Sequence, residues 1–576
     1  MKLIISDYLA SLRERDELDV LLPDLLSQMG LTVLTRPQRG TDQKGVDVVA
    51  VGKMSGQDEE KIYLLTIKPG NLTHDSWNGT SPQSLRPSLD QIQDDYIPHR
   101  ILPEHKNKPI VICVCIGGSI TEPLLSTVRG NLSARPYDIE LWNGEKIANL
   151  IVEHFLREDV LPTSNKSLLR KSLALVEEPE TSFGFFRQML YLAEKKLGDS
   201  PKDKLRALRQ MNVCTLVLAK WCRDVDNLEA AYLASELALL FSWHVCKDHA
   251  LREKPTALQK AFDDALNNAH RVQLLISHEY VAKIVKWAGK LYALSYSVRG
   301  ANAVDTNLKL FDVLGRVALS GLWHYSILRS LSVAGNKEGV DKAGADLAGC
   351  AWSICELIAN NPILNTPCKD SQIVDIALAC LVLRAGGQAQ YAGEWLLNLL
   401  ERVKLLIEGE GAYPCILQSY PDLLDHPHKD DPEYFKKVTS SSEMYPAIAL
   451  IAGVLGRDDV FAAVQDLKKT ALPHCNFQMW YLDDESEANF YLNKGMHGLE
   501  LASLDVGNKQ LFLEAIFREC RENSAFRNMS IMKPGLFYLT FVGCRHHRLP
   551  VPPDFFLAIY EQEKKGRQDE SPREDS

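Results

Sequence analysis

Two apolar stretches decide the fold of the first part of the chain: KGVDVVAVG at residues 44–52 and KIYLLTIKPG at residues 61–70. Both are rich in β-branched residues and contain or end in Gly or Pro, which predicts two strands. If the strands pair as a hairpin, Asp47 at the start of the first meets Thr66 and Lys68 at the end of the second. Thr66 and Lys68 share one face because side chains alternate along a strand. The sequence therefore predicts an acid, a hydroxyl and a lysine at one edge of a sheet.

The residues around these strands predict a small α/β sandwich over residues 1–157. A helical pattern comes first, interrupted by Pro23 and stopped by Gly30. Further strand signals follow at LTVLTRP (31–37), PIVICVCIGG (109–118) and YDIELW (137–142). The second of these is almost wholly apolar, which is typical of a strand in the middle of a covered sheet. The expected order is one helix, three strands and then alternating helices and strands.

The rest of the chain has a different periodicity. Strand signals nearly vanish, and apolar residues recur at i, i+3, i+4 and i+7, as at Val281, Ile284, Val285 and Ala288. We therefore expect a large all-α region, which a solenoid or an irregular bundle would satisfy equally, because no fixed repeat is found. The expected boundaries are a polar linker at 158–184, helices at 185–562 and a disordered tail at 563–576.

Composition limits the class of protein. At 576 residues the chain is too long for one core, and its formal net charge of -10 excludes a polycation that grips nucleic acid along its whole surface. A local basic groove is still compatible with this charge. Thirteen cysteines occur without a C-x-x-C pair, which favours reduced, buried thiols over zinc or disulfides.

The distribution of charged and apolar residues also predicts the cellular compartment. The N-terminus meets charged residues too early for a secretory signal. The most apolar long stretch, residues 230–246, contains Glu236 and predicts a buried helix rather than a membrane span. We expect a cytoplasmic protein without a membrane partner.

The residue types at the predicted sheet edge suit phosphodiester hydrolysis. A divalent cation held by oxygen ligands lowers the pKa of a bound water, and a neighbouring lysine stabilises developing negative charge. Mg²⁺ (or Mn²⁺) keeps several waters, so few protein ligands suffice. Asp47, Thr66 and the backbone carbonyl of Ile67 are the expected metal ligands, with Lys68 beside them.

Four segments, at residues 18–30, 45–47, 66–68 and 139–155, resemble in their order along the chain the PD-(D/E)xK restriction-endonuclease superfamily, specifically its Mrr-like branch. LDVLLPDLLSQMG (18–30) matches the branch's helix motif, and IELWNGEKIANLIVEHF (139–155) is similar to its closing strand and helix. Gly45-Val46-Asp47 matches G-x-D, and Thr66-Ile67-Lys68 stands at (E/Q)-x-K. The resemblance covers residues 15–156, about a quarter of the chain. It implies a metal-dependent endonuclease of double-stranded DNA, with Asp47, Lys68, Thr66 and Asp19 in catalysis.

Thr66 is where the sequence departs from the family pattern. A hydroxyl is a weaker ligand than a carboxylate, so a metal site here would lose one negative charge. The resemblance allows a neutral Gln at this position, so a neutral side chain does not exclude activity. An acid could also have migrated to another element. The candidates lie downstream in the chain: Asp75, Asp90, Asp94 and Asp95.

Contacts to DNA phosphates are expected from basic residues near the site, namely Arg36, Arg39, Lys44 and Arg86. The stretch 71–88 is polar and contains His74 and Trp77. A loop that contacts the substrate and an ordinary connection explain it equally well.

The other motifs of the sequence predict no further catalytic or metal site. The chain has no P-loop, so a nucleotide-driven motor would have to be another subunit. HPHKDD (426–431) and CRHHR (544–548) lack the spacing of a zinc site, and we expect them in surface loops.

Three functions remain open. The first is a DNA endonuclease controlled by a helical region that senses, forms a homo-oligomer or docks a partner subunit, with restriction or anti-phage defence as the setting by analogy. The second is a catalytically silenced DNA-binding or scaffold protein that kept the nuclease fold. The third is a helical adaptor whose first domain mediates assembly.

Overall fold

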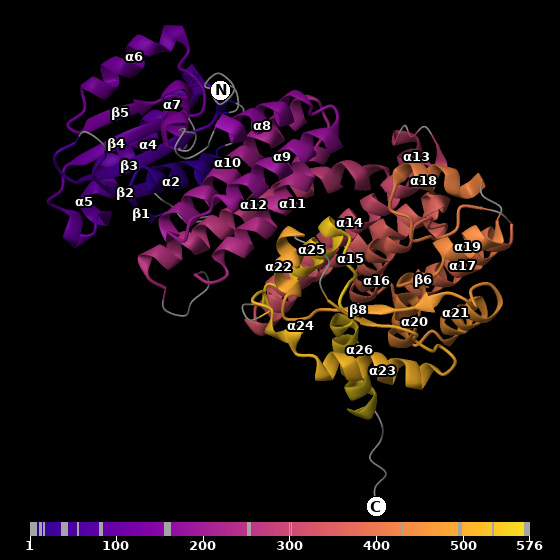
Figure 1. Ribbon diagram of the computed structural model, residues 1–576. Coiled ribbons are helices and arrows are strands. Elements are labelled where there is room, and N and C mark those ends of the chain that lie inside the picture. Colours follow the sequence, from indigo (N-terminus) through magenta and orange to yellow (C-terminus); the bar gives the residue numbers. More distant parts are fainter. Residues whose placement is uncertain are drawn as a thin grey trace, which may run out of the picture. The chain divides into compact units, whose positions relative to one another are not determined.

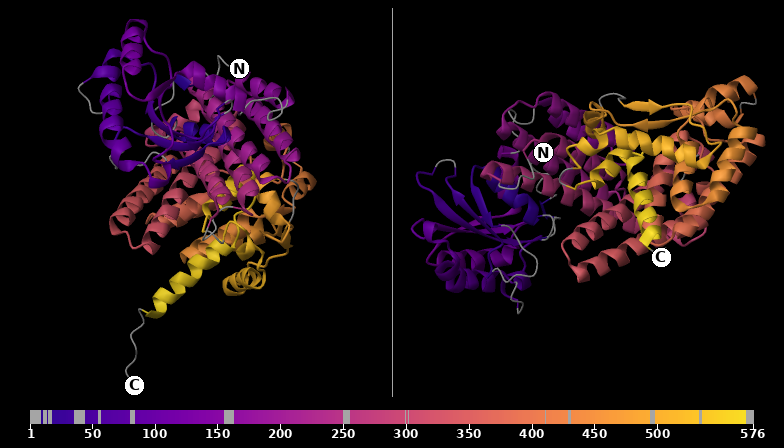
Figure 2. Two further views of the ribbon diagram at one scale, coloured as in Figure 1. Left: turned by 90° about the vertical axis from the view of Figure 1, so that its left-hand side faces the viewer. Right: turned by 90° about the horizontal axis from the view of Figure 1, so that it is seen from below.

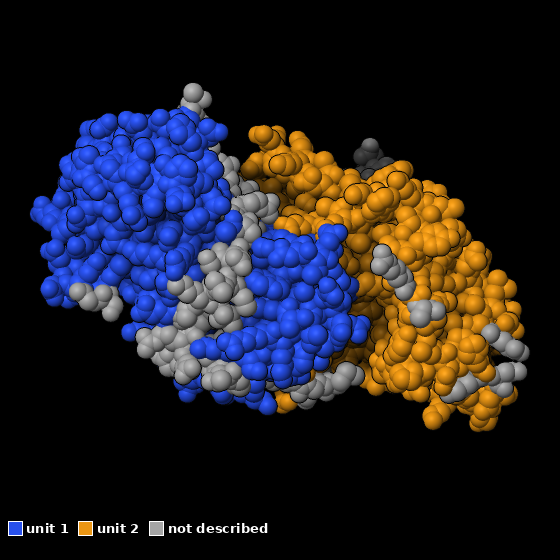
Figure 3. All heavy atoms as spheres, turned by 90° about the horizontal axis from the view of Figure 1, so that it is seen from above, with its two compact units in different colours: residues 1–276 blue, residues 277–576 orange. Residues whose placement is uncertain are grey.

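The computed structural model divides the chain into two compact units, residues 1–276 and residues 277–576 (Figure 3). The structure describes all residues except 1–8, 11–13, 15–17, 36–43, 55–56, 80–83, 155–162, 250–254, 299, 301, 410, 429–430, 494–497, 533–534 and 570–576.

The first unit contains a five-stranded mixed sheet in the order β1-β2-β3-β4-β5. Strands β1, β2 and β3 are antiparallel, whereas β3, β4 and β5 are parallel (Figures 1 and 2). The bounds are β1 Thr32–Thr35, β2 Val48–Gly52, β3 Lys61–Lys68, β4 Ile110–Ile116 and β5 Asp138–Trp142. All five strand signals of the sequence are confirmed, and so is the β2–β3 hairpin.

Helices cover the sheet, as the sandwich prediction requires. An apolar cluster joins the sheet to helices α3, α4 and α6. Helix α2 packs on β1 and β2, and α7 packs on α2 and β5. The bounds of these helices are α2 Asp19–Gln28, α3 His74–Asn78, α4 Leu85–Gln91, α6 Glu122–Ser133 and α7 Gly144–His154; the short helices η2 Ile92–Tyr96, α5 Ile97–Arg100 and η3 Pro103–His105 lie between α4 and β4. Trp77 of α3 is buried in this cluster, which makes it a core residue rather than one available to a substrate.

The structure corrects the prediction of a linker at residues 158–184. Within residues 158–184 the described part forms helix α8 and the start of α9, which pack against each other. Leu169, Leu173 and Val176 are buried there, and the Ser182 hydroxyl donates to the Ser172 carbonyl at 2.8 Å. The polar composition of this stretch predicts a linker, but apolar residues on one face of the helix are enough to bury it. The unit continues to residue 276 through helices α8 Thr163–Ala174, α9 Pro179–Lys195, α10 Pro201–Asp224, α11 Glu229–Cys246 and most of α12 Ala257–Ala288.

The second unit is mainly helical. Its helices are α13 Ala293–Ser297, α14 Ala303–Val333, α15 Lys337–Asn360, η4 Pro362–Asn365, η5 Asp370–Gln372, α16 Ile373–Ala385, α17 Ala389–Glu408, α18 Tyr420–Asp425, η6 His426–His428, α19 Pro432–Val438, α20 Met444–Leu455, α21 Asp458–Thr470, α22 Ser486–Leu492, α23 Lys509–Glu522, α24 Ala525–Asn528, α25 Tyr538–His547 and α26 Asp554–Asp569. The pattern does not foresee four short strands in two small sheets: β6 Ser441–Ser442 with β7 Asn476–Phe477, and β8 Met479–Tyr481 with β9 Leu499–Leu501. The tail prediction is wrong for residues 563–569, which continue α26; residues 570–576 lie outside the described residues.

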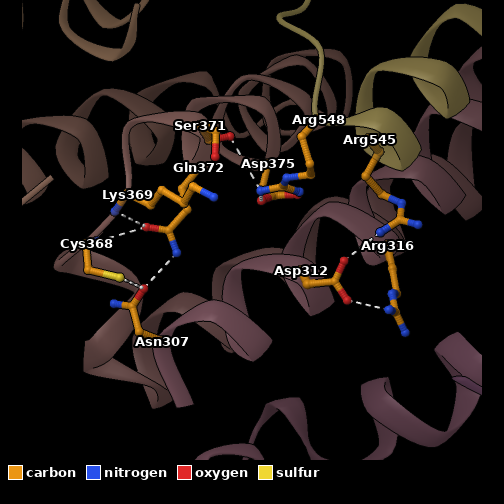
Figure 4. A network of polar contacts seen from close by, with 10 residues as sticks. All are labelled: Asn307, Asp312, Arg316, Cys368, Lys369, Ser371, Gln372, Asp375, Arg545 and Arg548. Carbon is orange, nitrogen blue, oxygen red and sulfur yellow. Dashed lines mark hydrogen bonds and ion pairs between the residues drawn. The ribbon is translucent and has the colours of Figure 1, made fainter. Parts of the chain in front are cut away.

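Two ion pairs, each with one fully buried partner, tie α14, α16 and the end of α25 together in the second unit (Figure 4). Arg548 donates two hydrogen bonds to Asp375, at 3.0 and 2.6 Å, and Arg545 donates to Asp312 at 2.6 Å. Burial by itself would raise the pKa of the Asp312 carboxyl. The positive charges of Arg316 and Arg545 outweigh this effect and lower the pKa. The expectation of a surface loop at 544–548 is therefore wrong. A second such expectation, at 426–431, is wrong for His426, which is buried and hydrogen-bonded to Tyr434 and to the Tyr413 carbonyl.

Two expectations from composition can be checked. All thirteen cysteines are free, and all but Cys350 are buried. Over the part of the chain that the structure describes, no helix is both long enough and apolar enough to cross a membrane.

Candidate active site

Asp47 is fixed to strand β3 by two hydrogen bonds. Its backbone N–H donates to the Leu65 carbonyl at 2.8 Å, and its carboxylate oxygen Oδ2 accepts from the Ile67 N–H at 2.7 Å. The strand register, which pairs Val48 with Leu65, brings Asp47 to this place. The predicted meeting of Asp47 with the Thr66–Lys68 segment is confirmed in the geometry.

Thr66 lies in the interior of the sheet. It is 1 % exposed and pairs with Val114 of β4. Its hydroxyl Oγ1 is buried and has no hydrogen-bond partner among the described residues. A buried hydroxyl without a partner costs about 1–3 kcal/mol, so this oxygen is a candidate contact for a bound water or cation.

Lys68 ends β3 and is also buried, at 9 % exposed. A lysine so placed is rare unless its charge is compensated. The compensating field comes partly from Asp47, since the two groups interact electrostatically. The carbonyl of Lys68 accepts from the Gly117 N–H at 3.1 Å, which ties the end of β3 to the end of β4.

The electrostatics of Asp47 show how the site is assembled. Burial raises the pKa of its carboxyl to about 6, while the Ile67 N–H and Lys68 act in the opposite direction. Glu14 and Asp19 add to the rise because they are further negative charges nearby. Near neutral pH, a bound cation would relieve this repulsion.

Asp19 lies in the first turn of α2, half-buried, and its charge acts on Asp47, so the structure brings the two together. Glu14 is a residue that the sequence analysis missed. It lies five positions before Asp19, but no motif connects it to the strands. Its place near Asp47 follows only from the tertiary structure.

Glycines allow the backbone to close around the site. Gly45 has φ +80°, and a Cβ there would lie 2.3 Å from the carbonyl oxygen of Ser88 in α4. The glycine of G-x-D is thus required by conformation and by space. At the carboxyl ends of β4 and β5, a Cβ on Gly144 would lie 2.3 Å from the Gly117 carbonyl oxygen.

The residues expected to contact phosphates are only partly placed. Arg36 and Arg39 lie outside the described residues. Lys44 forms an ion pair with Asp95 at 3.2 Å. Arg86 is exposed on α4, where its Nη1 donates to Asn78 at 3.4 Å. Of these four residues the structure therefore places only Lys44 and Arg86.

The four candidates for a migrated acid are engaged elsewhere or exposed. Asp90 pairs with Arg135 at 2.7 Å, and Asp95 pairs with Lys44. Asp75 and Asp94 are exposed on α3 and η2. The acids whose charge reaches Asp47 are instead Glu14 and Asp19.

Comparison of the chain with models of protein families, with curated proteins and with solved structures gives no match in any of the three.

The donor set can be tested against a magnesium ion. Within the described residues, no three His, Cys, Asp or Glu side chains are grouped as metal ligands. Two oxygen donors nevertheless lie near the end of β3: the Asp47 carboxylate and the Thr66 hydroxyl, which has no hydrogen-bond partner within the described part of the chain. Mg²⁺ retains several waters and accepts one or two protein carboxylates, so this set is small but of the right chemistry.

Proposed function

We propose that the protein is a metal-dependent DNA endonuclease whose site is formed by Asp47, Thr66 and Lys68. The observation that carries the proposal is the position of the Asp47 carboxylate, which is hydrogen-bonded to Ile67 between Thr66 and Lys68. Asp47 stands directly before β2, in a sheet with two antiparallel pairings, β1–β2 and β2–β3, followed by two parallel pairings, β3–β4 and β4–β5. Restriction or anti-phage defence is part of the proposal by analogy only.

The geometry supports the following roles. Asp47, the Thr66 hydroxyl and the Ile67 carbonyl would hold Mg²⁺ or Mn²⁺, which supplies an activated water and offsets negative charge on the phosphate. Lys68 contributes a positive charge next to Asp47, where it stabilises the phosphate as charge develops. Asp19 contributes a further negative charge close to Asp47, and we assign it to positioning the cation.

A specific observation also favours the alternative, a silenced nuclease fold that binds DNA or acts as a scaffold. Thr66 replaces the carboxylate or amide of the family pattern, and its 1 % exposure leaves little room for substrate beside the hydroxyl. In this alternative the fold remains, with DNA binding or a scaffold role, while hydrolysis is lost.

Plasmid cleavage separates the two functions. Supercoiled plasmid is incubated with the full chain and Mg²⁺ or Mn²⁺, beside Asp47→Ala and Lys68→Ala. Lys61→Ala is the matched control, because Lys61 lies at the opposite end of the same strand. The nuclease proposal expects loss of at least about a hundredfold in rate for the first two variants and an unchanged rate for the control. Binding of DNA by the wild type without any cleavage favours the silenced alternative.

A further inference from the structure

The second unit contains an apolar pocket that the proposed nuclease site does not use. It has a volume of about 560 Å³ and lies between helices α14, α16, α25 and α26. Small-molecule sites in proteins commonly have volumes of about 300–1,000 Å³. The pocket therefore has the size of a site for one small organic ligand.

Aromatic rings form one wall of this pocket. Phe555 of α26 lies 4.4 Å from Phe541 and 5.0 Å from Phe526, measured between ring centroids. Phe537 lies 6.2 Å from Phe541 in an edge-to-face arrangement. Leu322 and Leu381 add aliphatic surface from the facing helices α14 and α16. A ligand ring or chain can pack against this wall because aromatic rings favour offset and edge contacts at such distances.

Charged groups lie on the same lining. Arg329 of α14 lies over the Phe537 ring at 5.6 Å, and Arg384 stands in the last turn of α16. The lining also includes Asp554, whose carboxyl has a pKa of about 6 because burial raises it, with Arg527 acting against the rise. The charged residues of the lining are thus two arginines and one aspartate.

We propose that this pocket binds a small hydrophobic anion, with its ring or chain on the phenylalanine wall and its carboxylate, sulfonate or phosphate at Arg329 and Arg384. Charge complementarity selects the anion, because guanidinium groups bind oxyanions through charge-assisted hydrogen bonds. The apolar wall selects a ligand with an aromatic or aliphatic body. This proposal does not depend on the nuclease site, since every lining residue belongs to residues 322–562.

The test uses two fluorescent probes that differ in charge. The first is 8-anilinonaphthalene-1-sulfonate, an aromatic anion, and the second is N-phenyl-1-naphthylamine, which has the same rings without the sulfonate. Each is titrated into the full chain and into variants whose folding is verified by circular dichroism. Arg329→Met and Arg384→Met, alone and together, remove the guanidinium groups. Arg402→Met is the control, since Arg402 is an exposed arginine of α17 outside the lining.

Two further variants fill the pocket. Ala558→Trp adds volume from α26 and Ser330→Trp from α14, and both positions are exposed residues of the lining, so the fold should tolerate them. We expect the filling variants to weaken both probes by at least about tenfold. The arginine double variant should weaken the sulfonate probe by about tenfold or more and change the neutral probe less than about twofold.

The proposal is overturned if both probes bind the filling variants as they bind the wild type, since the fluorescence would then come from another surface. It is also overturned if the arginine variants weaken the two probes equally. A change from oligomer to monomer in light scattering on Ala558→Trp or Ser330→Trp would likewise contradict it, because the pocket would then be an interface between two copies of the chain.

Discussion

The carboxylate of Asp47 accepts a hydrogen bond of 2.7 Å from the backbone N–H of Ile67, twenty residues further along the chain. Ile67 stands between Thr66 and Lys68, so this bond fixes the acid beside the two other residues of the candidate site. One carboxylate oxygen is thereby oriented by the strand. A site preorganised in this way needs little rearrangement to bind a cation.

Asp47→Asn should stabilise the metal-free protein at high pH. The folded pKa of about 6 lies above the value of about 3.9 for an unfolded Asp, so folding favours the protonated form. Ionised Asp47 therefore lowers the free energy of unfolding; this destabilisation is absent below about pH 4 and complete above about pH 6 to 7. Urea unfolding should show the variant more stable by about 1–3 kcal/mol at pH 8, with the difference shrinking toward pH 4. Asp58→Asn, at an exposed position, is the control; equal differences at both pH values for Asp47→Asn would contradict this reading.

Thr66→Val should also stabilise the metal-free protein. Valine has nearly the same shape, and the Thr66 hydroxyl has no partner among the described residues, so its removal relieves a desolvation cost of about 1 kcal/mol. Thr215 is a matched control, because it is equally buried but its hydroxyl donates to the Met211 carbonyl at 2.8 Å. Thr215→Val should be destabilising by about 1 kcal/mol in the same denaturation assay. If Thr66→Val behaves like Thr215→Val, the hydroxyl of Thr66 has a partner, and its assignment as an available ligand fails.

Gly45→Ala should be among the most destabilising substitutions near the site. The added Cβ would combine a positive φ with an approach of 2.3 Å to the Ser88 carbonyl, and we expect a loss of about 2–4 kcal/mol. Gly30→Ala separates the two causes. Gly30 has φ +92° but no atom within 4 Å of its Cβ position, so only about 1 kcal/mol should be lost. Thermal unfolding of both variants gives the comparison; equal losses would show that the contact with α4 is unimportant.

The sequence predicted the sheet well because each strand carries its own local signal. β3 and β4 are nearly continuous apolar runs, which only a strand covered on both faces accommodates. The meeting of Asp47 with Thr66 and Lys68 followed from the hairpin alone. Glu14 could not be found in this way, because its proximity to Asp47 depends on the tertiary structure and no local pattern connects it to the strands.

The helical region shows where sequence patterns fail. Helix periodicity identified the helices but not which polar residues are buried between them. CRHHR (544–548) predicts a surface loop, yet Arg545 is 2 % exposed and pairs with Asp312, more than 200 positions away. A charged side chain is buried when a partner of opposite charge meets it, and a single sequence does not reveal that partner.

Arg548→Met should strongly destabilise the second unit. Asp375 is fully buried, and without Arg548 its carboxylate would be left without this bidentate partner; because the Arg548 side chain is 35 % exposed, we expect a cost of about 2–3 kcal/mol, less than for a pair buried on both sides. The loss should be larger at pH 8 than at pH 5, because burial already raises the pKa of Asp375 and protonation relieves the charge. Arg521→Met is the control: its pair with Glu561 is about half exposed, so unfolding should change by less than about 0.5 kcal/mol. Similar losses for the two variants would contradict a structural role for the buried pair.

The most direct measurement for the candidate site is a titration with Mn²⁺, followed by electron paramagnetic resonance of the free ion. Three proteins are compared: the wild type, Asp47→Asn and Thr66→Glu. We predict one Mn²⁺ site in the wild type, its loss or weakening by at least about tenfold in Asp47→Asn, and tighter binding in Thr66→Glu because a carboxylate replaces the neutral hydroxyl. Equal Mn²⁺ binding by all three proteins, or none by Thr66→Glu, would contradict a metal site at the end of β3.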